Sequence, residues 1–346
     1  MRAALLTEFR APLTIAAVAE PDCPEDGVVL RVLACGICRS DWHAWTGADP
    51  VPLPHIPGHE YCGVVEEVGP RVTGWRRGDR VIAPFILACG TCPDCRTGHQ
   101  TICATQALPG FNRAGAFAER IAVPHADANL ARLPEGMDPA LAAALGCRVT
   151  TAWQALTDRA ALAPGEWLAV HGAGGVGLSA LMLAKAIGAR VVMVDVVPEK
   201  LTFATALGAD AVIDARAGDA AEAVRAVTGG GADVAIEALG IETTTVAAIR
   251  SLRKRGRMVQ IGMPAGDHVT MRLPMDAVYS GQLALYGTRG MPGWRYPSLF
   301  SLIAGGRLDL SPLIARRVPL SQASAELAAF DGPTPPGVAV ITDFTA

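Results

Sequence analysis

Two cysteines and a histidine, in three separate segments of the chain, offer the ligands of a reactive metal ion. Cys38 lies in CGICRSDWH, His59 in PGHEYCG and Cys147 in LGCRVTTAW. Each residue alone would more often be a packing residue. Together they supply three ligands of a tetrahedral zinc and leave a fourth position for water or substrate. Asp41 is placed to orient His59 through the ring nitrogen that does not bind the metal. We therefore predict a catalytic zinc site.

Four further cysteines crowd into the single stretch CGTCPDCRTGHQTIC, at Cys89, Cys92, Cys95 and Cys103. Four thiolates leave zinc no open position, so this spacing predicts a structural zinc that holds a loop in shape. A redox pair needs only two cysteines and a thioredoxin-like setting. An iron–sulfur cluster is a weaker alternative, because the fourth cysteine falls in the same loop and no proline follows it. A zinc ribbon that binds nucleic acid would need basic surroundings, which this segment lacks.

A glycine-rich turn predicts a dinucleotide site. The segment LAVHGAGGVGLSALMLAKAIGARVVMVD places Gly172, Gly174 and Gly177 in G-x-G-x-x-G register between a predicted strand and a predicted helix. The loop expected to cradle the phosphates is Gly172, Gly174, Gly175, Val176 and Gly177. Asp195 ends the next apolar run, where a carboxylate can bind both hydroxyls of a ribose and repel a 2'-phosphate. We therefore expect NAD in preference to NADP, with Lys200 near the same ribose.

The elements that must position these groups suggest an α/β fold in two parts. Residues 1–148 contain short Val-rich runs between turn residues, such as GVVLRVLA and GVVEEVG, which predict a mostly β domain holding both zinc sites. Residues 149–288 alternate apolar runs with Ala-rich segments, which predicts a Rossmann-type, doubly wound parallel sheet. Residues 289–346 contain a predicted helix in LFSLIAGGRL and a predicted strand in GVAVITDF. We expect this last segment to pack back on the first domain.

Composition narrows the classes of protein. The chain has 346 residues, of which 51% are hydrophobic and 18% charged, and a net charge of -3, so it should fold and has no excess of positive charge for nucleic acid. The N-terminal residues lack the order of a signal peptide, and no apolar run reaches the ~18 residues that span a bilayer. We expect no membrane partner and a cytoplasmic location, with reduced thiols. Cys23, Cys35 and Cys62 are interpreted as packing residues.

In combination and order, GICRSD, PGHE, the four-cysteine stretch, LGC, and GAGGVG followed by Asp195 resemble the zinc-containing medium-chain alcohol dehydrogenases over nearly the whole chain. The resemblance implies a GroES-like catalytic domain and two zinc ions per chain. It implies that Cys38, and not Cys35, is the first ligand of the catalytic zinc. It also implies that Glu60 is a nearby carboxylate able to exchange onto the metal.

The same resemblance implies a reaction. Alcohol would bind the open zinc position as an alkoxide and transfer hydride to NAD, giving an aldehyde or ketone from a primary or secondary alcohol. Ser40 and His43 match a proton relay, and Arg39 matches a residue that contacts the cofactor pyrophosphate. A homotetramer is implied, with a dimer as the alternative, through edge pairing of the nucleotide-binding sheets.

Four aromatic residues resemble positions that line the family's substrate channel: Trp42, Trp45, Phe85 and Phe111. They favour an apolar alcohol as the small-molecule substrate, although core packing explains each of them equally well. A polyol dehydrogenase of the same superfamily is the nearest alternative and would need a polar pocket. A zinc-free quinone reductase would not need the ligands. A non-catalytic protein that binds NAD is the alternative from another class.

Overall fold

The computed structural model describes residues 1–332 and 336–345, and the chain forms two compact units. The first unit comprises Met1–Thr150, Gly290–Ser301 and Ser311–Ala346, and the second comprises Thr151–Arg289 and Leu302–Leu310. The segment 302–310 thus groups with the second unit, whereas we had expected all of 289–346 to pack on the first. Among the described residues, no helix has the length and apolar character needed to cross a bilayer.

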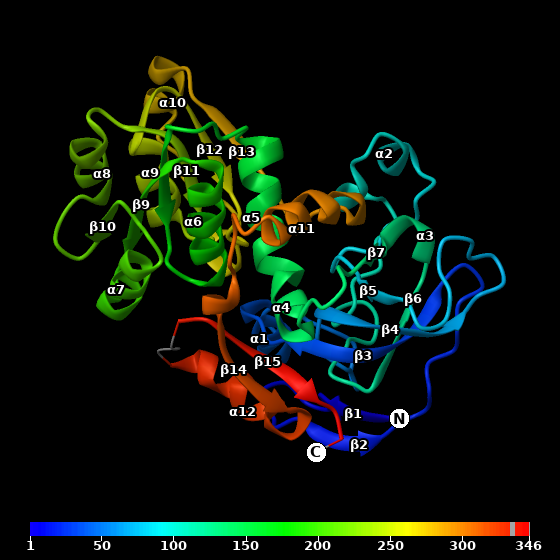
Figure 1. Ribbon diagram of the computed structural model, residues 1–346. Coiled ribbons are helices and arrows are strands. Elements are labelled where there is room, and N and C mark those ends of the chain that lie inside the picture. Colours follow the sequence, from blue (N-terminus) through cyan, green and yellow to red (C-terminus); the bar gives the residue numbers. More distant parts are fainter. Residues whose placement is uncertain (333–335, 346) are drawn as a thin grey trace. The chain divides into compact units, whose positions relative to one another are not determined.

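A seven-stranded sheet forms the first unit (Figure 1). Its strands, in spatial order, are β14 (Ile314–Pro319), β15 (Val338–Asp343), β3 (Val28–Gly36), β4 (Glu60–Val68), β5 (Arg80–Ile82) and β7 (Ala131–Arg132), with β6 (Arg120–Val123) also pairing with β3. A separate antiparallel pair consists of β1 (Arg2–Leu5) and β2 (Thr14–Ala17). Strands β3 and β4 lie where the Val-rich runs predicted them, because β-branched residues fit a pleated, buried surface.

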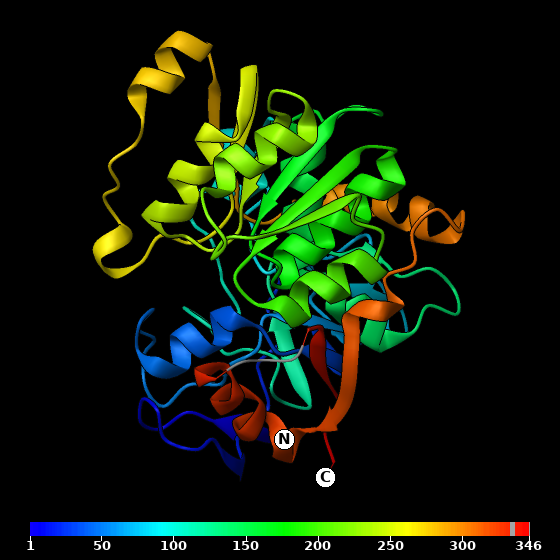
Figure 2. The same cartoon turned by 90° about the vertical axis from the view of Figure 1, so that its left-hand side faces the viewer.

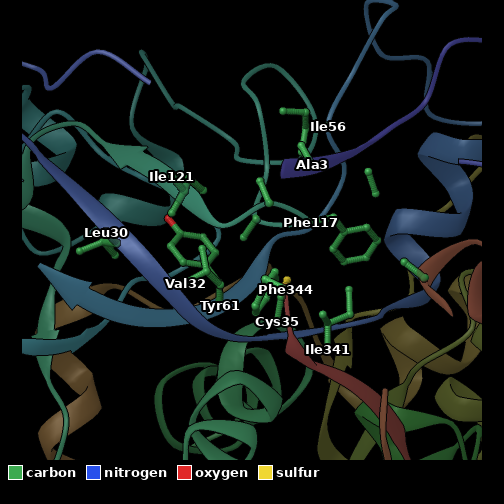
Figure 3. Close-up of a cluster of buried hydrophobic side chains, with 14 of the residues drawn as sticks. Ala3, Leu30, Val32, Cys35, Ile56, Tyr61, Phe117, Ile121, Ile341 and Phe344 are labelled. Atoms are coloured by element: carbon green, nitrogen blue, oxygen red, sulfur yellow. The ribbon is translucent and has the colours of Figure 1, made fainter. Parts of the chain in front are cut away.

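The core of the first unit draws on both ends of the chain. Ala3, Phe117 and Ile341 are fully buried in one cluster (Figure 3). Cys35 lies in the same cluster with no exposed surface, which gives it the packing role expected from the sequence. The short helices of this unit are α1 (Arg39–Thr46), α2 (Pro93–Arg96), α3 (Ala126–Asn129), α4 (Pro139–Ala144) and α12 (Ala323–Ala328).

The second unit is built on a six-stranded, entirely parallel sheet. Its strands, in spatial order, are β10 (Ala211–Asp214), β9 (Arg190–Asp195), β8 (Trp167–His171), β11 (Ala232–Glu237), β12 (Leu252–Gln260) and β13 (Ala284–Gly287). Counted along the chain, this is the order 3-2-1-4-5-6 of a doubly wound dinucleotide-binding fold. The predicted fold class is confirmed.

Helices connect these strands and lie against the parallel sheet (Figure 2). They are α6 (Gly175–Ile187), α7 (Pro198–Ala206), α8 (Ala220–Thr228), α9 (Glu242–Arg250) and α10 (Met275–Gly281). Two more helices, α5 (Thr150–Gln154) and α11 (Tyr296–Ala304), include residues of both units. Helix α11 begins before the segment that predicted it and ends ahead of Gly306, whose positive φ of 67° stops the helix.

Candidate active site

The turn from β3 into α1 positions Cys38 and Asp41. Cys38 caps the N-terminus of α1, and Asp41, three residues later, accepts a hydrogen bond from the Cys38 N–H at 2.9 Å. This hydrogen bond satisfies the backbone N–H of Cys38, the residue that begins the helix. The local sequence thus holds the backbone of the first expected ligand.

Asp41 also holds the second expected ligand, from a different strand. Its Oδ1 atom lies 2.7 Å from Nδ1 of His59 and 3.2 Å from the backbone nitrogen of Gly58. Both side chains of the Asp41–His59 pair are completely buried. Burial alone would lower the pKa of His59, but the Asp41 carboxylate raises it well above its usual range.

Cys147 lies in a π-helical turn, Leu145–Val149, that follows α4 directly. Such widened turns interrupt a helix and are common at functional sites. The turn brings Cys147 to Cys38 and His59, and to Glu60. One ligand atom from each of these four residues, here called the ligand cluster, lies within 4.8 Å of the others.

The ligand cluster fits a zinc ion. Nε2 of His59 is buried and has no hydrogen-bond partner in the part of the chain that the structure describes, while Nδ1 is held by Asp41. This arrangement suits a zinc-binding imidazole, because Asp41 fixes the ring orientation through Nδ1 and a zinc ion would displace the proton from Nε2. A hydrogen bond from Cys147 and the charge of Arg148 hold the pKa of Cys38 well below its usual value, so a thiolate is available. The hydrogen bond to Cys38, burial and the charge of Cys38 in turn raise the pKa of Cys147 well above its usual value. A dication would displace that second proton.

Arg148 is a site residue that the sequence analysis missed. Its guanidinium is buried and donates to Oε2 of Glu60 at 2.8 Å and to the carbonyl oxygen of Ile37 at 3.0 Å. Burial raises the pKa of Glu60 to about 7, against the lowering effect of Arg148. A cation inside the apolar stretch LAAALGCRV was the available signal, because arginine is rarely buried without a specific partner.

The four aromatic candidates separate into two groups. Phe85 and Phe111 flank the His59 ring, with ring centroids 5.8 Å and 5.2 Å away. Trp45 is instead buried in the core of the first unit, and its indole N–H donates to the carbonyl of Ala11. The structure therefore gives Trp45 a packing role, which its size and apolar body suit.

The side chain of Trp42 contacts Arg39 and Asp331. The Arg39 guanidinium lies 4.9 Å from the ring centroids of both Trp42 and Phe330, and Nη1 donates to the Phe330 carbonyl at 3.0 Å. The Trp42 N–H donates to Oδ1 of Asp331 at 2.9 Å. Cation–π contacts of this kind hold the cation in place. Trp42 thus positions the residue expected to meet the cofactor pyrophosphate.

Ser40 and His43 stand three residues apart on α1, a spacing that places them on one face of the helix. Nδ1 of His43 is buried and has no hydrogen-bond partner within residues 1–332 and 336–345. Burial and the nearby charge of Arg39 lower the pKa of His43 below 6.5. His43 is therefore neutral near pH 7 and able to accept a proton.

The four sulfur atoms of the cysteine lobe, Cys89, Cys92, Cys95 and Cys103, form a compact group. Measured Sγ–Sγ separations run from 3.4 to 3.9 Å, and none of the four is in a disulfide. Zinc with Zn–S bonds of ~2.3 Å would place sulfur atoms ~3.8 Å apart, so the lobe fits tetrahedral zinc. The Thr91 hydroxyl and the N–H groups of Thr91 and Cys92 lower the pKa of Cys89 to about 5.

In the second unit, the glycine loop joins β8 to α6 as predicted. Gly172 has a φ of 108°, and a Cβ on Gly177 would collide with the carbonyl oxygen of Gly172. Gly175 and Val176 open helix α6, so their N–H groups lie at its N-terminus, where phosphate binds. Asp195 ends β9, and its Oδ2 accepts the N–H of Ala173 at 2.6 Å. Lys200 lies in the first turn of α7, which follows β9.

A doubly wound sheet combined with two clusters of zinc-type ligands defines a class of metal-dependent, dinucleotide-linked dehydrogenases. Residues 24–135 match the family described as alcohol dehydrogenase GroES-like domain, and residues 175–305 match the zinc-binding dehydrogenase family. The chain belongs to the zinc-type medium-chain alcohol dehydrogenases, as its motifs had indicated.

Individual relatives agree with this assignment. An alcohol dehydrogenase of Geobacillus stearothermophilus is 39% identical over 76% of this chain and 78% of its own length. An L-threonine 3-dehydrogenase of Bacillus velezensis is 33% identical over 92% of each chain. The structure of alcohol dehydrogenase TADH from Thermus sp. ATN1 superposes with a TM-score of 0.92 at 30% identity, covering 99% of this chain and 100% of that one.

Proposed function

We propose that this enzyme catalyses the reversible, NAD-linked oxidation of primary or secondary alcohols to aldehydes or ketones. The observation that carries the proposal is the ligand cluster, in which two thiols and one imidazole converge, and the imidazole nitrogen facing them has no hydrogen-bond partner among the described residues. A protein that had lost catalysis would be free to lose these residues.

The chain offers two zinc positions of different kinds. Cys38, His59 and Cys147 would hold the catalytic ion, and the cysteine lobe would hold a structural one. A bound catalytic zinc supplies a Lewis acid that lowers the pKa of the alcohol hydroxyl, and NAD supplies the hydride acceptor. The four thiols of the cysteine lobe leave no open coordination position, so the zinc they would hold stabilises the loop and takes no part in the reaction.

The protein's own side chains align the reactants and move the proton. Asp41 fixes the His59 ring through Nδ1, so that Nε2 faces the cluster. Ser40 would take the alcohol proton, and His43, which is neutral because its pKa is lowered, would accept it for release to solvent. Phe85 and Phe111 beside His59 exclude water and favour apolar alcohols over polyols.

The cofactor is proposed to be NAD, with its phosphates on the loop Gly172, Gly174, Gly175, Val176 and Gly177. Asp195 would bind the adenine-side ribose, because its carboxylate accepts three backbone N–H bonds and retains lone pairs for hydroxyls. Lys200, in the first turn of α7, would lie near the same ribose. Arg39 would bind the pyrophosphate of the cofactor.

We retain the division into a catalytic part at 1–148, a cofactor part at 149–288 and a returning segment at 289–346 as a proposal about roles. A cytoplasmic location is supported by the nine cysteines, because none of them forms a disulfide in the part of the chain that the structure describes. A homotetramer, or alternatively a dimer, is supported by the edge position of β13 in the parallel sheet and by the exposed Tyr279 nearby. Light scattering coupled to size exclusion measures the oligomer directly.

Formation of NADH with a panel of alcohols tests the function. The panel includes apolar primary, secondary and aromatic alcohols, a polyol and L-threonine, each with and without a zinc chelator. We expect the apolar alcohols to be oxidised fastest and the chelator to abolish the rate. Preference for the polyol would favour the alternative dehydrogenase. NAD binding without oxidation of any alcohol would favour a non-catalytic protein.

A further inference from the structure

Arg148 follows the ligand Cys147 directly, and its guanidinium reaches the chain neighbours of the other two ligands. Nη2 donates to the carbonyl of Ile37, the residue before the first cysteine ligand, at 3.0 Å. It also donates to Glu60, the residue after the histidine ligand, at 2.8 Å. One buried side chain therefore ties together the three segments that carry ligands.

The carboxylate of Glu60 has a closely defined setting. Oε1 accepts the N–H groups of Cys147 and Arg148 at 3.0 and 3.3 Å, and Oε2 accepts the guanidinium. A Cβ on Gly36 would lie 2.5 Å from Oε2, and one on Gly146 would lie 2.7 Å from the Cα of Glu60. Two glycines thus leave just enough room for this side chain, which has no exposed surface.

Glu60 is close enough to compete for the metal. A carboxylate oxygen of Glu60 lies within 4.8 Å of the other ligand atoms of the cluster, and carboxylates are themselves zinc ligands. A buried carboxylate needs a cationic partner, and the guanidinium of Arg148 forms the ion pair with Glu60 among the described residues. A dication held by the three ligands would be a competing partner. Without Arg148, the metal would be the remaining partner.

We propose that Arg148 is a positioning residue that holds Glu60 off the catalytic metal and so keeps the fourth coordination position open for substrate. The inference rests on the proposed function, since it assumes a metal in the ligand cluster. Arg148 touches neither substrate nor cofactor in this scheme. It acts by fixing the position of the Glu60 carboxylate, which would otherwise occupy the fourth coordination position of the metal.

Cobalt substitution tests this without turnover. The metal-replaced enzyme is titrated with imidazole, and binding at the open position is followed by the visible absorption of cobalt. The cysteine lobe has no open position and does not respond. We expect Arg148→Met to weaken imidazole binding by about tenfold or more. Arg148→Lys should recover part of the loss, and adding Glu60→Gln to Arg148→Met should restore binding nearly to the wild-type value.

Arg132→Met is the matched control, because Arg132 forms an ion pair with Asp79 at 2.6 Å in the same unit but contacts no ligand segment. Its cobalt spectrum and imidazole affinity should equal those of the wild type. If Arg148→Met fails to fold or to hold cobalt, the double variant decides, since it leaves no unpaired buried charge. Wild-type imidazole binding in Arg148→Met, or loss of cobalt in the double variant as well, overturns the proposal. An inactive alcohol panel would refute the proposed function and leave this comparison intact.

Discussion

Asp41 and His59 form a fully buried pair in which the carboxylate oxygen lies 2.7 Å from Nδ1 of the imidazole. The same carboxylate accepts the backbone N–H of Cys38 at 2.9 Å. One side chain therefore orients two expected zinc ligands that are 21 positions apart in the sequence.

Asp41→Asn should lower the affinity of the catalytic zinc by ~10- to 100-fold, because an amide holds the imidazole less strongly and offers no charge. Competition with a chromogenic chelator measures that affinity. Asp127→Asn is a suitable control, since Asp127 also accepts backbone N–H groups but contacts no ligand. Equal zinc affinity in Asp41→Asn and the wild type would contradict an orienting role.

His43→Ala should slow alcohol oxidation by ~100-fold near neutral pH. Burial and Arg39 lower the pKa of His43, so the wild type has a neutral base at pH 7 and loses it as the pH falls through that pKa. The deficit should shrink at alkaline pH, where hydroxide can take the proton. Rate profiles against pH for both enzymes check this, with His125→Ala as control, because His125 is half-buried and pairs with Asp26 away from the ligand cluster. Parallel pH–rate profiles of the wild type and His43→Ala would show that His43 takes no part in the proton relay.

Trp42→Leu should weaken NAD binding by about two- to fivefold, the effect of losing a cation–π contact of ~0.5–1 kcal/mol. The Trp42 ring lies 4.9 Å from the Arg39 guanidinium and helps to hold it in place. Quenching of protein fluorescence by NADH measures the dissociation constant. Trp75→Leu removes a similar contact with Arg132 and should change nothing. If Trp42→Leu changed the alcohol preference without changing the NAD affinity, Trp42 would instead line the substrate channel.

Asp195→Ser should raise the preference for NADP over NAD by about tenfold, equivalent to ~1.4 kcal/mol, because it removes the carboxylate that repels a 2'-phosphate. Ratios of kcat/KM for the two cofactors provide the measurement. Asp214→Ser, at the register position beside Asp195 on the neighbouring strand, is the control and should leave the ratio unchanged. A wild-type preference for NADP would show that the ribose assignment is wrong.

Arg255→Gly should stabilise the second unit. Arg255 has a φ of 60°, a left-handed conformation that costs a non-glycine residue ~1–2 kcal/mol, whereas glycine loses only ~0.5–1 kcal/mol of chain entropy there. A rise of about 1–2 °C in the thermal midpoint is expected. Ala247→Gly, in the interior of helix α9, should lower the midpoint instead. A lower midpoint for Arg255→Gly would show that its side chain contributes more than its backbone costs.

Local spacing was enough to predict much of this molecule. The glycine loop after β8, the acidic end of β9 and the four-cysteine stretch are each encoded within about 30 residues, and the doubly wound sheet follows from the alternation of apolar and Ala-rich segments. The affiliation of residues 302–310 was not predictable, because a short connection carries no periodicity that says which sheet it joins. The sequence could not tell the roles of Trp42 and Trp45 from those of Phe85 and Phe111, because an aromatic ring packs equally well in a core, against a cation or beside a pocket.

The sequence by itself determined which residues have metal chemistry and which segments must be strands and helices, because side-chain type and hydrophobic period are local properties. Only the tertiary structure decided that Asp41 reaches His59, that a π-helical turn carries Cys147 to Cys38, and that Arg148 holds Glu60. These contacts join positions far apart in the chain, and their distances are set by how the strands pair and how the buried charges find partners.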